Sequence, residues 1–562
     1  MSPDSGSGWS RRDLLKTFLG APLALLAGCD SNKAKATPLP PGEIVGASDG
    51  AGHRIRDGFR PVVAPNAWQS KEVVIVGGGI AGLSAAWRLK RAGVNNFVLL
   101  ELEPAAGGTA RYGQSSIGAY PWGAHYIPAP RQENTALLTL LDEMGVLEGR
   151  DESGEPVVAE QFLCRDPQER IFYKGRWYEG LYLRAGASAG DLRQWDAFKR
   201  EIDRWVAWRD GKGRRAFDIP VASGSDDAEV RALDKLSMAE FLDRGGYTSP
   251  RLRWYAEYAC RDDYGASLQD TSAWAGLFYF ASRIPAPGRE AQALMTWPEG
   301  NGRFVAHLLG QVGEHVRSGA AVCEISSRSM GVPPMRASLP NTGDKDLLEV
   351  TAFDAATNEP IGMRAQHVIF AAPQFLARHL IRPWRENPPA HVREFEYGAW
   401  FVANLFLKDR PASAAAGFPL CWDNVLYESP SLGYVVATHQ TENERGPTVF
   451  TYYYPLCDAD PRQARARLLA LDRGACAELA LADLSVAHPE IRALTERIDV
   501  MRWGHAMIRP RPGFVWSDAR AKAAEPFGNI HFANTDLSGV ALFEEAFYHG
   551  NRAAEEVLMA RV

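Results

Sequence analysis

One stretch near the beginning of the chain, Val73 to Ala86, constrains the fold more than any other part of the sequence. It opens with four β-branched residues, which predict a buried strand, and continues into three glycines at G-x-G-x-x-G spacing, Gly77, Gly79 and Gly82. In this pattern the first glycine permits a tight turn and the second leaves the backbone open to a pyrophosphate. The third lets the following helix pack closely on the strand. The stretch therefore predicts the strand, turn and helix of a Rossmann-like unit that binds a dinucleotide.

The residues on either side of the turn support this prediction. The helix that begins with Ile80 and Ala81 directs its free N–H groups and the positive end of its dipole at the phosphates. A second apolar strand, residues 97–100, ends in Glu101, whose carboxylate could accept hydrogen bonds from both ribose hydroxyls of an adenosine. Glu103 lies two residues further along the same side and is an alternative acceptor. Because strand, turn, helix, strand and acid follow one another in full, we interpret Glu101 as part of a cofactor site and not as an ordinary solvated strand end.

The next segment separates FAD from NAD. The run from Pro104 to Arg111, with Gly107 and Gly108 at its centre, resembles the flavin-containing amine oxidase superfamily. The resemblance implies FAD as the cofactor and close approach of the flavin to the backbone of the two glycines. Relatives carry an arginine directly after the glycine pair, and this chain has Thr109 there, so Arg111 is the candidate that offsets the pyrophosphate charge.

Four later stretches extend the resemblance. Residues 120–127 are similar to the glycine-rich segment that passes the flavin face, and residues 367–373 are similar to the strand that returns to the flavin domain. Residues 322–325 resemble the strand beside the adenine, and residues 530–554 resemble the closing strand and helix. The resemblance implies further cofactor contacts at Val322, Ala372, Asp536 and Ala546.

The predicted fold class is α/β, with a Rossmann-like FAD-binding domain and a discontinuous α+β substrate domain made of an antiparallel sheet plus helices. The FAD-binding domain is expected at 71–150, 297–395 and 500–562, and the substrate domain at 151–296 and 396–499. The antiparallel sheet is expected from alternating apolar runs. These runs are Trp400–Leu407, Leu432–Thr438 and Thr448–Tyr454. Aromatic stripes in the region 195–280 are interpreted mainly as core.

The first 29 residues predict an export signal. Arg11 and Arg12 precede an apolar run, residues 17–28, which is shorter than the ~20 residues of a membrane-spanning helix. The arginine pair indicates the twin-arginine route. The end of the run resembles a lipoprotein cleavage box with Cys29 as the lipidated residue, which implies a lipid anchor on the periplasmic side of a bacterial membrane. Residues 30–70, rich in proline and small residues, are expected to be a flexible tether.

Charge and cysteine spacing exclude several classes of partner. The net charge of −6 comes without a long block of one sign, which argues against nucleic-acid binding. No C-x-x-C or H-E-x-x-H spacing occurs, so no metal is expected. If Cys29 is lipidated, six cysteines remain, of which Cys323 in an apolar strand is expected to be a buried thiol. The sequence leaves the disulfide state and the oligomeric state open.

Amine oxidation of a small-molecule substrate is the activity implied by the resemblance, with O₂ or a membrane quinone as acceptor. No cysteine lies in the loop 502–507, so non-covalent FAD is expected. Many relatives have a lysine beside the flavin, but residues 374–379 contain none. The catalytic candidates are therefore His125, Arg378, His379 and His505, with Asp262, Asp263 and Tyr264 as further polar candidates. Two alternatives stay open, a desaturase or isomerase acting on an apolar substrate and a non-catalytic anchored flavoprotein.

Overall fold

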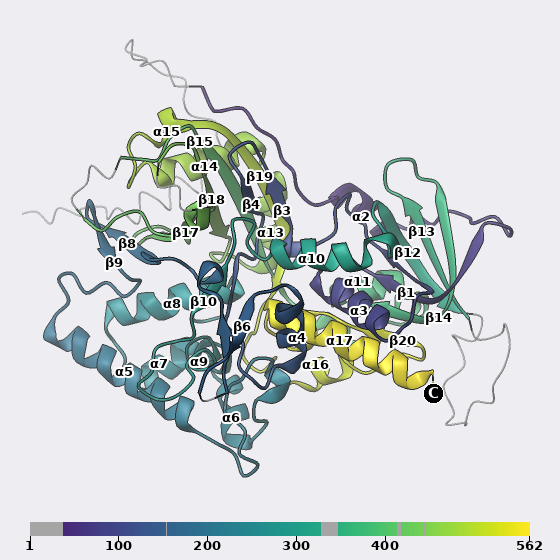
Figure 1. Cartoon of the computed structure of the whole chain (residues 1–562), viewed down its shortest axis with the longest axis horizontal. Helices are drawn as coiled ribbons and strands as arrows, with labels where there is room; N and C mark the ends of the chain where they lie inside the picture. The colour runs from purple at the N-terminus through teal and green to yellow at the C-terminus, as the bar shows by residue number, and fades with distance from the viewer. Residues whose placement is uncertain (1–37, 153, 328–346, 413–416, 442–444, 562) are drawn as a thin grey trace, which may run out of the picture. The chain divides into compact units, whose positions relative to one another are not determined.

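The β-branched run at 73–76 forms the end of a long central strand in a seven-stranded sheet, on the right in Figure 1. In spatial order the strands are β11 (Val316–Arg317), β2 (Phe97–Leu100), β1 (Trp68–Val76), β14 (Pro360–Phe370), β13 (Leu348–Asp354) and β12 (Ala320–Ser327). β20 (Ile530–Phe532) pairs with the end of β14. The pairings of β1, β2, β11, β14 and β20 with one another are parallel, whereas β13 pairs with its neighbours in antiparallel fashion.

The structure is a computed structural model that describes residues 38–561, apart from 153, 328–346, 413–416 and 442–444. The expected export signal, including Cys29, lies outside the described residues. From Pro40 onward the chain forms one compact unit.

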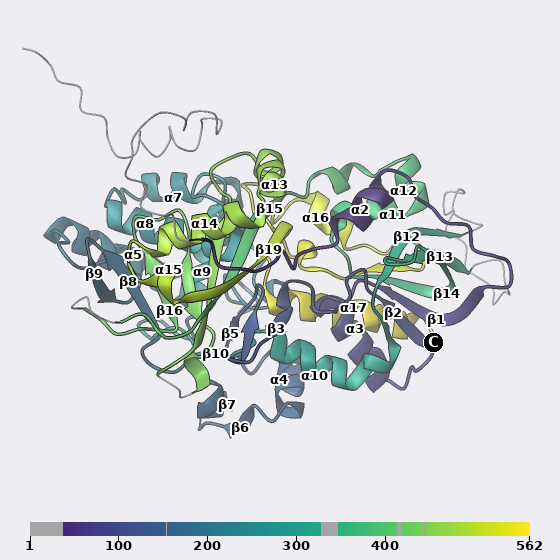
Figure 2. The same ribbon diagram turned by 90° about the horizontal axis from the view of Figure 1, so that it is seen from above.

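Both faces of this sheet are covered, as expected for parallel strands. Val73 and Ile75 of β1 point into one core and Val74 and Val76 into another, because successive side chains of a strand face opposite ways. The first core holds the helices α3 (Ile80–Arg91), α4 (Thr135–Glu143), α10 (Gly302–Val312) and α17 (Phe543–Ala560). The second holds α11 (Gln374–Leu380), α12 (Arg382–Glu386) and α16 (Asp518–Ala523). In Figure 2, α11 and α12 lie on one side of the sheet and α3, α10 and α17 on the other.

A second seven-stranded sheet lies at the upper left of Figure 1. In spatial order it contains β19 (Thr495–Ile508), β15 (Tyr397–Leu407), β18 (Thr448–Pro455), β17 (Gly433–Val436), β16 (Asp423–Leu426), β8 (Glu169–Tyr173) and β9 (Arg176–Glu179). Every pairing is antiparallel except that of β16 with β8. The predicted strands near 400, 432 and 448 are confirmed as β15, β17 and β18. The helices after β18 are α13 (Pro461–Ala470), α14 (Arg473–Leu484) and α15 (Ile491–Leu494).

Short strand pairs connect these parts of the chain. They are β3 (Tyr112–Gln114) with β4 (Ala119–Pro121), β5 (Tyr126–Pro128) with β10 (Leu294–Thr296), and β6 (Leu147–Arg150) with β7 (Pro156–Val158).

A group of five helices fills the lower left of Figure 1. They are α5 (Ala189–Ala207), α6 (Ala228–Ala232), α7 (Met238–Arg244), α8 (Pro250–Tyr264) and α9 (Ala273–Ala281). Their aromatic side chains form a core in which Trp205, Phe217 and Trp274 are buried. The interpretation of the aromatic stripes as core is confirmed for these residues.

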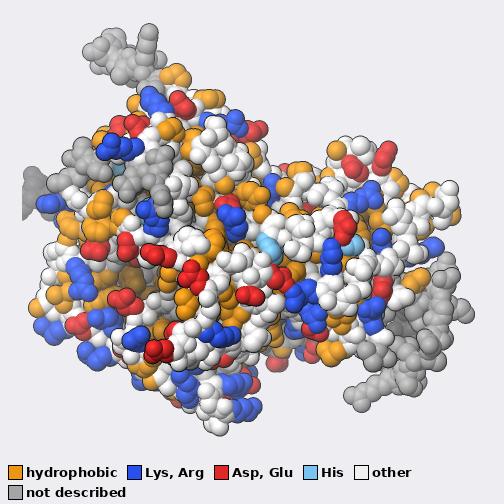
Figure 3. All heavy atoms as spheres, viewed as in Figure 1, with side chains coloured by type: hydrophobic (Ala, Val, Ile, Leu, Met, Phe, Trp, Pro, Cys, Tyr) orange, Lys and Arg blue, Asp and Glu red, His pale blue; other side chains and the backbone are white. Residues whose placement is uncertain are grey.

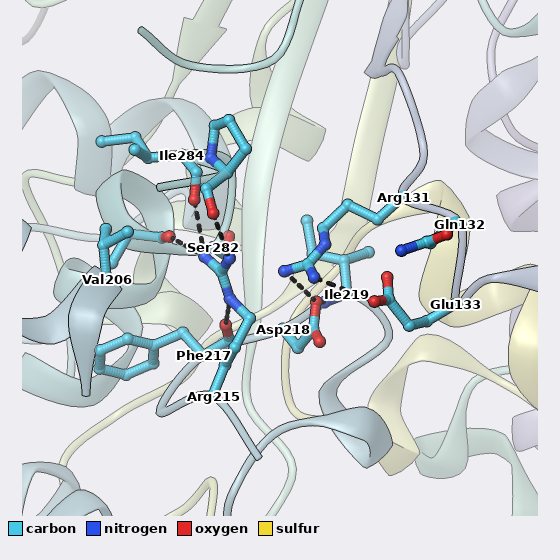
Figure 4. A network of polar contacts seen from close by, with 12 residues as sticks. Arg131, Gln132, Glu133, Val206, Arg215, Phe217, Asp218, Ile219, Ser282 and Ile284 are labelled. Atoms are coloured by element: carbon cyan, nitrogen blue, oxygen red, sulfur yellow. Dashed lines mark hydrogen bonds and ion pairs between the residues drawn. The ribbon is translucent and has the colours of Figure 1, made fainter. Parts of the chain in front are cut away.

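A buried arginine closes the end of α9 (Figure 4). The guanidinium of Arg215 donates to the carbonyl oxygens of Ala281, Ile284, Pro285 and Phe217 at 2.7–3.3 Å. The last carbonyls of a helix have no partner within the helix, and a cation also favours the negative end of its dipole. Arg215 therefore ties the C-terminal end of α9 to the loop before α6.

Two sequence-based boundaries need correction. Part of the expected tether is ordered, since residues 49–56 form the helix α2 (Asp49–Arg56) and β1 already begins at Trp68. The boundary expected at residue 500 falls inside β19, which pairs with β15 as far as Ile508. Both boundaries were wrong for the same reason. The structure of these segments depends on pairing with residues far along the chain, which the local composition does not show. No helix in the described part of the chain is long and apolar enough to cross a membrane.

Candidate active site

A cavity of about 900 Å³ lies where the two sheets and the helix α8 meet. One wall is the glycine turn after β1 with the carboxyl ends of β2 and β14, the edge at which an open α/β sheet binds its ligands. Another wall is formed by residues of α8, β16, β18 and β19. On the face drawn in Figure 3, basic and acidic side chains are interspersed among apolar ones.

The three glycines of the turn have different surroundings. Gly77 has a φ of +104°, a conformation that side chains other than glycine rarely adopt. A Cβ atom at Gly82 would lie 1.9 Å from the carbonyl oxygen of Gly77, so this glycine is needed for packing. A Cβ atom at Gly79 would have its nearest neighbour, the Cα atom of Gly108, at 3.9 Å, and Gly79 lines the cavity. The backbone at Gly79 is therefore open to a phosphate, and the cradle fits a dinucleotide cofactor.

Glu101 lines the cavity, but neighbouring backbone amides use part of its hydrogen-bonding capacity. Its carboxylate accepts from the N–H of Gly78 at 2.5 Å and from the N–H of Glu103 at 2.8 Å. Burial raises its pKa from the ordinary value. Each carboxylate oxygen can accept a second bond, so Glu101 still fits a ribose hydroxyl.

Glu103, the alternative acceptor, is held by the N-terminal segment. Its carboxylate accepts from the N–H of Ser48 at 2.7 Å and from the hydroxyl of Ser48 at 3.0 Å. Ser48 precedes α2, which also lines the cavity, so the segment expected to be a tether forms part of the wall. Sequence reasoning missed this segment, because it carries no motif and its partners lie far along the chain.

Arg111, the expected partner of the pyrophosphate, is not among the residues that line the cavity. Its guanidinium lies 3.7 Å from the carboxylate of Glu103, and its Cγ atom packs against Gly107. The described arginines that line the cavity are Arg56, Arg378, Arg465 and Arg502, and the histidines besides His125 are His53, His379 and His505. Burial lowers the pKa of His505 to about 4, so its ring is neutral near pH 7.

The other predicted cofactor residues line the cavity with one exception. Gly77, Ile80, Ala81, Gly107, Gly108, Val322, Ala372, Asp536 and Ala546 do so, whereas Gly82 is the packing glycine described above. Asp536 accepts from the N–H of Gln374 at 2.8 Å and from the hydroxyl of Tyr397. Burial raises the pKa of Asp536 to about 6. These positions surround one continuous space that can hold a flavin dinucleotide.

The four catalytic candidates fall into two groups. Arg378 and His379 lie next to each other on α11, and the ring of His505 on β19 stacks on Phe375 of the same helix at 4.0 Å between ring centres. His125 has other neighbours, the rings of Tyr126, Trp422 and Tyr453, which form what we call the aromatic chamber. The structure therefore separates His125 from the other three.

The aromatic chamber holds His125 in one orientation. Its ring stacks on Tyr453 at 4.9 Å between centroids and lies 5.3 Å from the ring of Trp422. Its Nδ1 atom is 3.2 Å from the carbonyl oxygen of Gly123. Because a carbonyl can only accept, Nδ1 carries the proton and Nε2 is an acceptor to which no described residue bonds. Burial lowers the pKa of His125 to about 4, so the ring is neutral near pH 7.

Carboxyl groups form the second feature of this chamber. Asp262 and Asp263 on α8 and Asp423 on β16 all line the cavity, and Asp262 and Asp423 lie close to Tyr453 of the chamber. Asp263 is paired with Arg283 at 2.7 Å, and Asp423 accepts from the hydroxyl of Tyr258 at 3.2 Å. Burial and the neighbouring Asp263 raise the pKa of Asp262 to about 7. Of these three residues, the sequence analysis named Asp262 and Asp263 as candidates and missed Asp423. The one sequence signal for Asp423 is its position as an acid at the start of an apolar strand.

Two residue types are missing from the lining of this cavity. Among the described residues that line it there is no lysine and no cysteine. The six cysteines of the described part are free thiols, and Cys323 is buried as expected. In the same part of the chain, no group of three or more histidine, cysteine, aspartate or glutamate side chains could hold a metal ion.

The comparison with protein families gives one assignment that covers most of the chain. The model of the family described as "Flavin containing amine oxidoreductase" matches residues 80–558. A curated relative, the oxidoreductase PigB of Serratia sp. (strain ATCC 39006), is 24% identical over 539 residues, which cover 86% of this chain and 75% of the relative.

Solved structures of two amine oxidases share the fold. A redesigned putrescine oxidase superposes with a TM-score of 0.61 at 17% identity, covering 88% of this chain and 99% of the other. Cyclohexylamine oxidase from Brevibacterium oxydans IH-35A gives a TM-score of 0.58 at 16% identity, covering 88% and 100%. At these identities the likeness concerns the fold.

Proposed function

Because the chain belongs to the flavin-containing amine oxidoreductase family, we propose that it oxidises an amine, and that the aromatic chamber around His125 receives the donor. The observation that carries this proposal is the continuity of that chamber with the glycine cradle in one cavity. A flavin bound along the cradle would supply the acceptor for two electrons. The protein itself binds and orients the donor and excludes water.

His125 is the residue best suited to orient the reacting nitrogen. An amine must be unprotonated to lose two electrons, and a neutral amine still has N–H groups to donate. The free Nε2 atom of His125 accepts such a bond, and its neutral ring does not repel an amine. Tyr453 restricts the ring by stacking and donates its own hydroxyl to Gly123 at 2.9 Å, which keeps the imidazole in place.

Buried carboxyl groups favour an amine over an apolar donor. Asp262, to which no described residue bonds, would be left without a partner beneath a hydrocarbon, and a buried polar group without a partner is costly. This is why we prefer amine oxidation to the desaturase or isomerase alternative. A flavoprotein that only transfers electrons holds no amine at this position, so the carboxyl group would also lack a partner there.

We expect FAD to be bound without a covalent link, since no cysteine is found among the described residues that line the cavity. The purified protein should absorb near ~370 and ~450 nm, as oxidised flavins do. Acid precipitation should release all of the colour into the supernatant. Anaerobic addition of a panel of amines and of apolar donors should bleach the ~450 nm band with an amine. Bleaching by a fatty acid or polyene alone would contradict the proposal, as would a flavin that no donor reduces.

The electron acceptor and the cellular location are part of the same proposal. Export by the twin-arginine route and a lipid at Cys29 would place the enzyme on the periplasmic side, where O₂ or a membrane quinone is the available acceptor. Replacing Arg11 and Arg12 by lysine should keep the flavoprotein in the cytoplasm. Cys29→Ala should move exported protein from the membrane fraction to the soluble fraction. An unchanged distribution in both variants would exclude this route.

A further inference from the structure

The segment that precedes β1 runs along the cavity from one sheet to the other. Residues 41–56, which we call the strap, include the helix α2 and come before the part of the chain that matches the family model. In Figure 1 the strap belongs to the purple segment that leads from β19 to α2. Among the residues that line the cavity are Ile44, Ala47, Ser48, His53 and Arg56 of the strap.

The beginning of the strap is attached to the second sheet. The backbone of residues 41–45 pairs with that of residues 498–500 of β19 through hydrogen bonds that are each 2.9 Å long. The N–H of Glu43 also donates to the carboxylate of Asp499 at 3.1 Å. The two backbones are in close contact, since a Cβ atom at Gly42 would lie 1.8 Å from the carbonyl oxygen of Ile498. This end of the strap therefore acts as an additional short strand beside β19.

The other end of the strap is attached to the first sheet. Ser48 donates its N–H to one carboxylate oxygen of Glu103 at 2.7 Å and its hydroxyl to the other oxygen at 3.0 Å. Hydrogen bonds to a carboxylate are stronger than those between neutral groups. Beyond Ser48, the side chains of Ala51 and Ile55 are buried in the core on one face of the first sheet. The strap thus connects the two sheets directly.

The attachment at Ser48 also links the strap to the cofactor cradle. The N–H of Glu103 donates at 2.8 Å to the carboxylate of Glu101, the residue that fits a ribose hydroxyl. Ser48 is therefore separated from the ribose acceptor by one residue. Gly79 of the cradle and Ala47 of the strap line the same cavity. A dinucleotide that fills this cavity is consequently bordered by the cradle and by the strap.

We propose that the strap is a further part of the FAD site and closes over the bound dinucleotide. FAD then leaves only after Ser48 has separated from Glu103 or residues 41–45 have separated from β19. By linkage, closure of the strap and binding of FAD stabilise each other by the same factor. This inference rests on the flavin and holds whichever donor is oxidised. For an exported enzyme, slow release would preserve a cofactor that is made in the cytoplasm.

The first test measures the release of FAD. Holoenzyme that carries isotope-labelled FAD is chased with an excess of unlabelled FAD, and the label retained by the protein gives the release rate. S48A removes the hydroxyl bond to Glu103 and should raise the release rate at least about tenfold, since hydrogen bonds to charged groups are among the stronger ones. A wild-type release rate in S48A would overturn the proposal.

Ser188 provides the matched control for S48A. At the start of α5 it donates its N–H and its hydroxyl to the carboxylate of Asp191, at 2.9 and 2.7 Å, and it is not among the residues that line the cavity. S188A loses an equivalent hydrogen bond and should change the release rate by less than about twofold. An equal acceleration in S188A and S48A would mean that general destabilisation releases FAD, and would contradict the strap.

The second test loosens the opposite end of the strap. Gly42 is not among the residues that line the cavity, so G42A removes no contact to FAD, yet its methyl group would overlap the backbone of β19. FAD release should again be at least about tenfold faster, because the open strap becomes more populated. The apoprotein of G42A should melt within about 2 °C of the wild type if the opening is local. An unchanged release rate in a G42A protein would overturn the proposal.

Hydrogen exchange tests the reciprocal effect of FAD on the strap. The amide protons of Val45 and Ser48 are bonded to Val500 and Glu103, and they should exchange at least about tenfold more slowly in the holoenzyme than in the apoprotein. A peptide from α5 should exchange equally in both. Equal protection of the strap in both forms would show that it closes independently of FAD, and the proposal would be wrong.

None of these measurements uses an amine, so the strap and the proposed function can fail separately. A holoenzyme that oxidises amines but releases FAD at the same rate in all variants leaves amine oxidation standing without the strap. A holoenzyme that no amine reduces, but whose FAD is released faster in S48A and G42A, supports the strap and contradicts amine oxidation.

Discussion

At the scale of single residues, Gly79 and Gly82 are three positions apart, and a side chain is excluded at the two positions for different reasons. Gly82 has no room for a side chain within the protein, since its Cβ atom would overlap the carbonyl oxygen of Gly77. Gly79 has room within the protein, and it faces the cavity. A side chain at Gly79 therefore affects a bound cofactor and leaves the fold unchanged.

The substitutions G79A and G82A test this difference. G79A should leave the free energy of unfolding of the apoprotein within about 0.5 kcal/mol of the wild type. It should weaken flavin binding at least about tenfold, or about 1.4 kcal/mol, because the added methyl group occupies the place of a phosphate. G82A should lower the free energy of unfolding by about 3 kcal/mol through overpacking. Denaturant titration and flavin content measure the two effects. A stable G79A protein that retains its full flavin would show that the phosphates lie elsewhere.

At the scale of secondary-structure elements, several helices and strands depend on partners that are distant in the sequence. The helix α2 is connected to the first sheet through Ser48 and Glu103, and the segment before it pairs with β19 at Val500. The end of α9 depends on Arg215, which lies more than sixty residues before it. Such contacts stabilise helices and strands that the local sequence alone does not specify.

Replacing Arg215 by methionine should destabilise the helical group. The variant keeps most of the side-chain volume but leaves the carbonyls at the end of α9 without a donor. Buried unpaired groups cost about 1–3 kcal/mol, and we expect a loss of about 3 kcal/mol in the free energy of unfolding. Arg204→Met on the exposed side of α5 is the control and should change it by less than about 1 kcal/mol. Equal effects of the two substitutions in denaturant titrations would argue against the capping role.

At the scale of the whole molecule, the protein buries several carboxyl groups with raised pKa values. Burial raises the pKa of Glu169, Asp262, Glu544 and Glu545 to about 7. The folded protein therefore binds more protons than the unfolded chain between about pH 4 and pH 7. By linkage, these groups contribute stability at low pH that is lost as the pH rises through 7. The buried histidines act in the opposite direction, but their effect is confined to pH values below about 6.5.

The melting temperature of the apoprotein should therefore fall between pH 6.5 and pH 8, by at least about 3 °C. Scanning calorimetry at constant ionic strength measures this change. The D262N variant should show a smaller decrease, since it removes one of the groups responsible. A melting temperature that stays constant or rises over this interval would mean that these acids are not buried in solution.

The sequence alone determined the parts of the molecule that depend on neighbouring residues. The glycine turn at Gly77 to Gly82 joins a strand to a helix within a few residues, so its steric requirements are readable in one stretch. The strands β15, β17 and β18 were likewise predictable from their own apolar patterns. The family resemblance added the remaining contacts of the cofactor cradle, most of which line the cavity.

The tertiary structure alone decided which charged residues meet. Asp262 and Asp423 lie on α8 and β16, and the fold brings both to one cavity, with Glu169 of β8 opposite Asp423 in the sheet. Arg111 lies beside the glycine pair in the sequence, yet it turns to Glu103 and not to the cavity. The physical reason is that a side chain's charge acts through space, over a few ångströms, on groups that any distance along the chain can separate. Local patterns therefore predicted the cofactor cradle, and only the packing of the sheets against α8 revealed the acidic chamber.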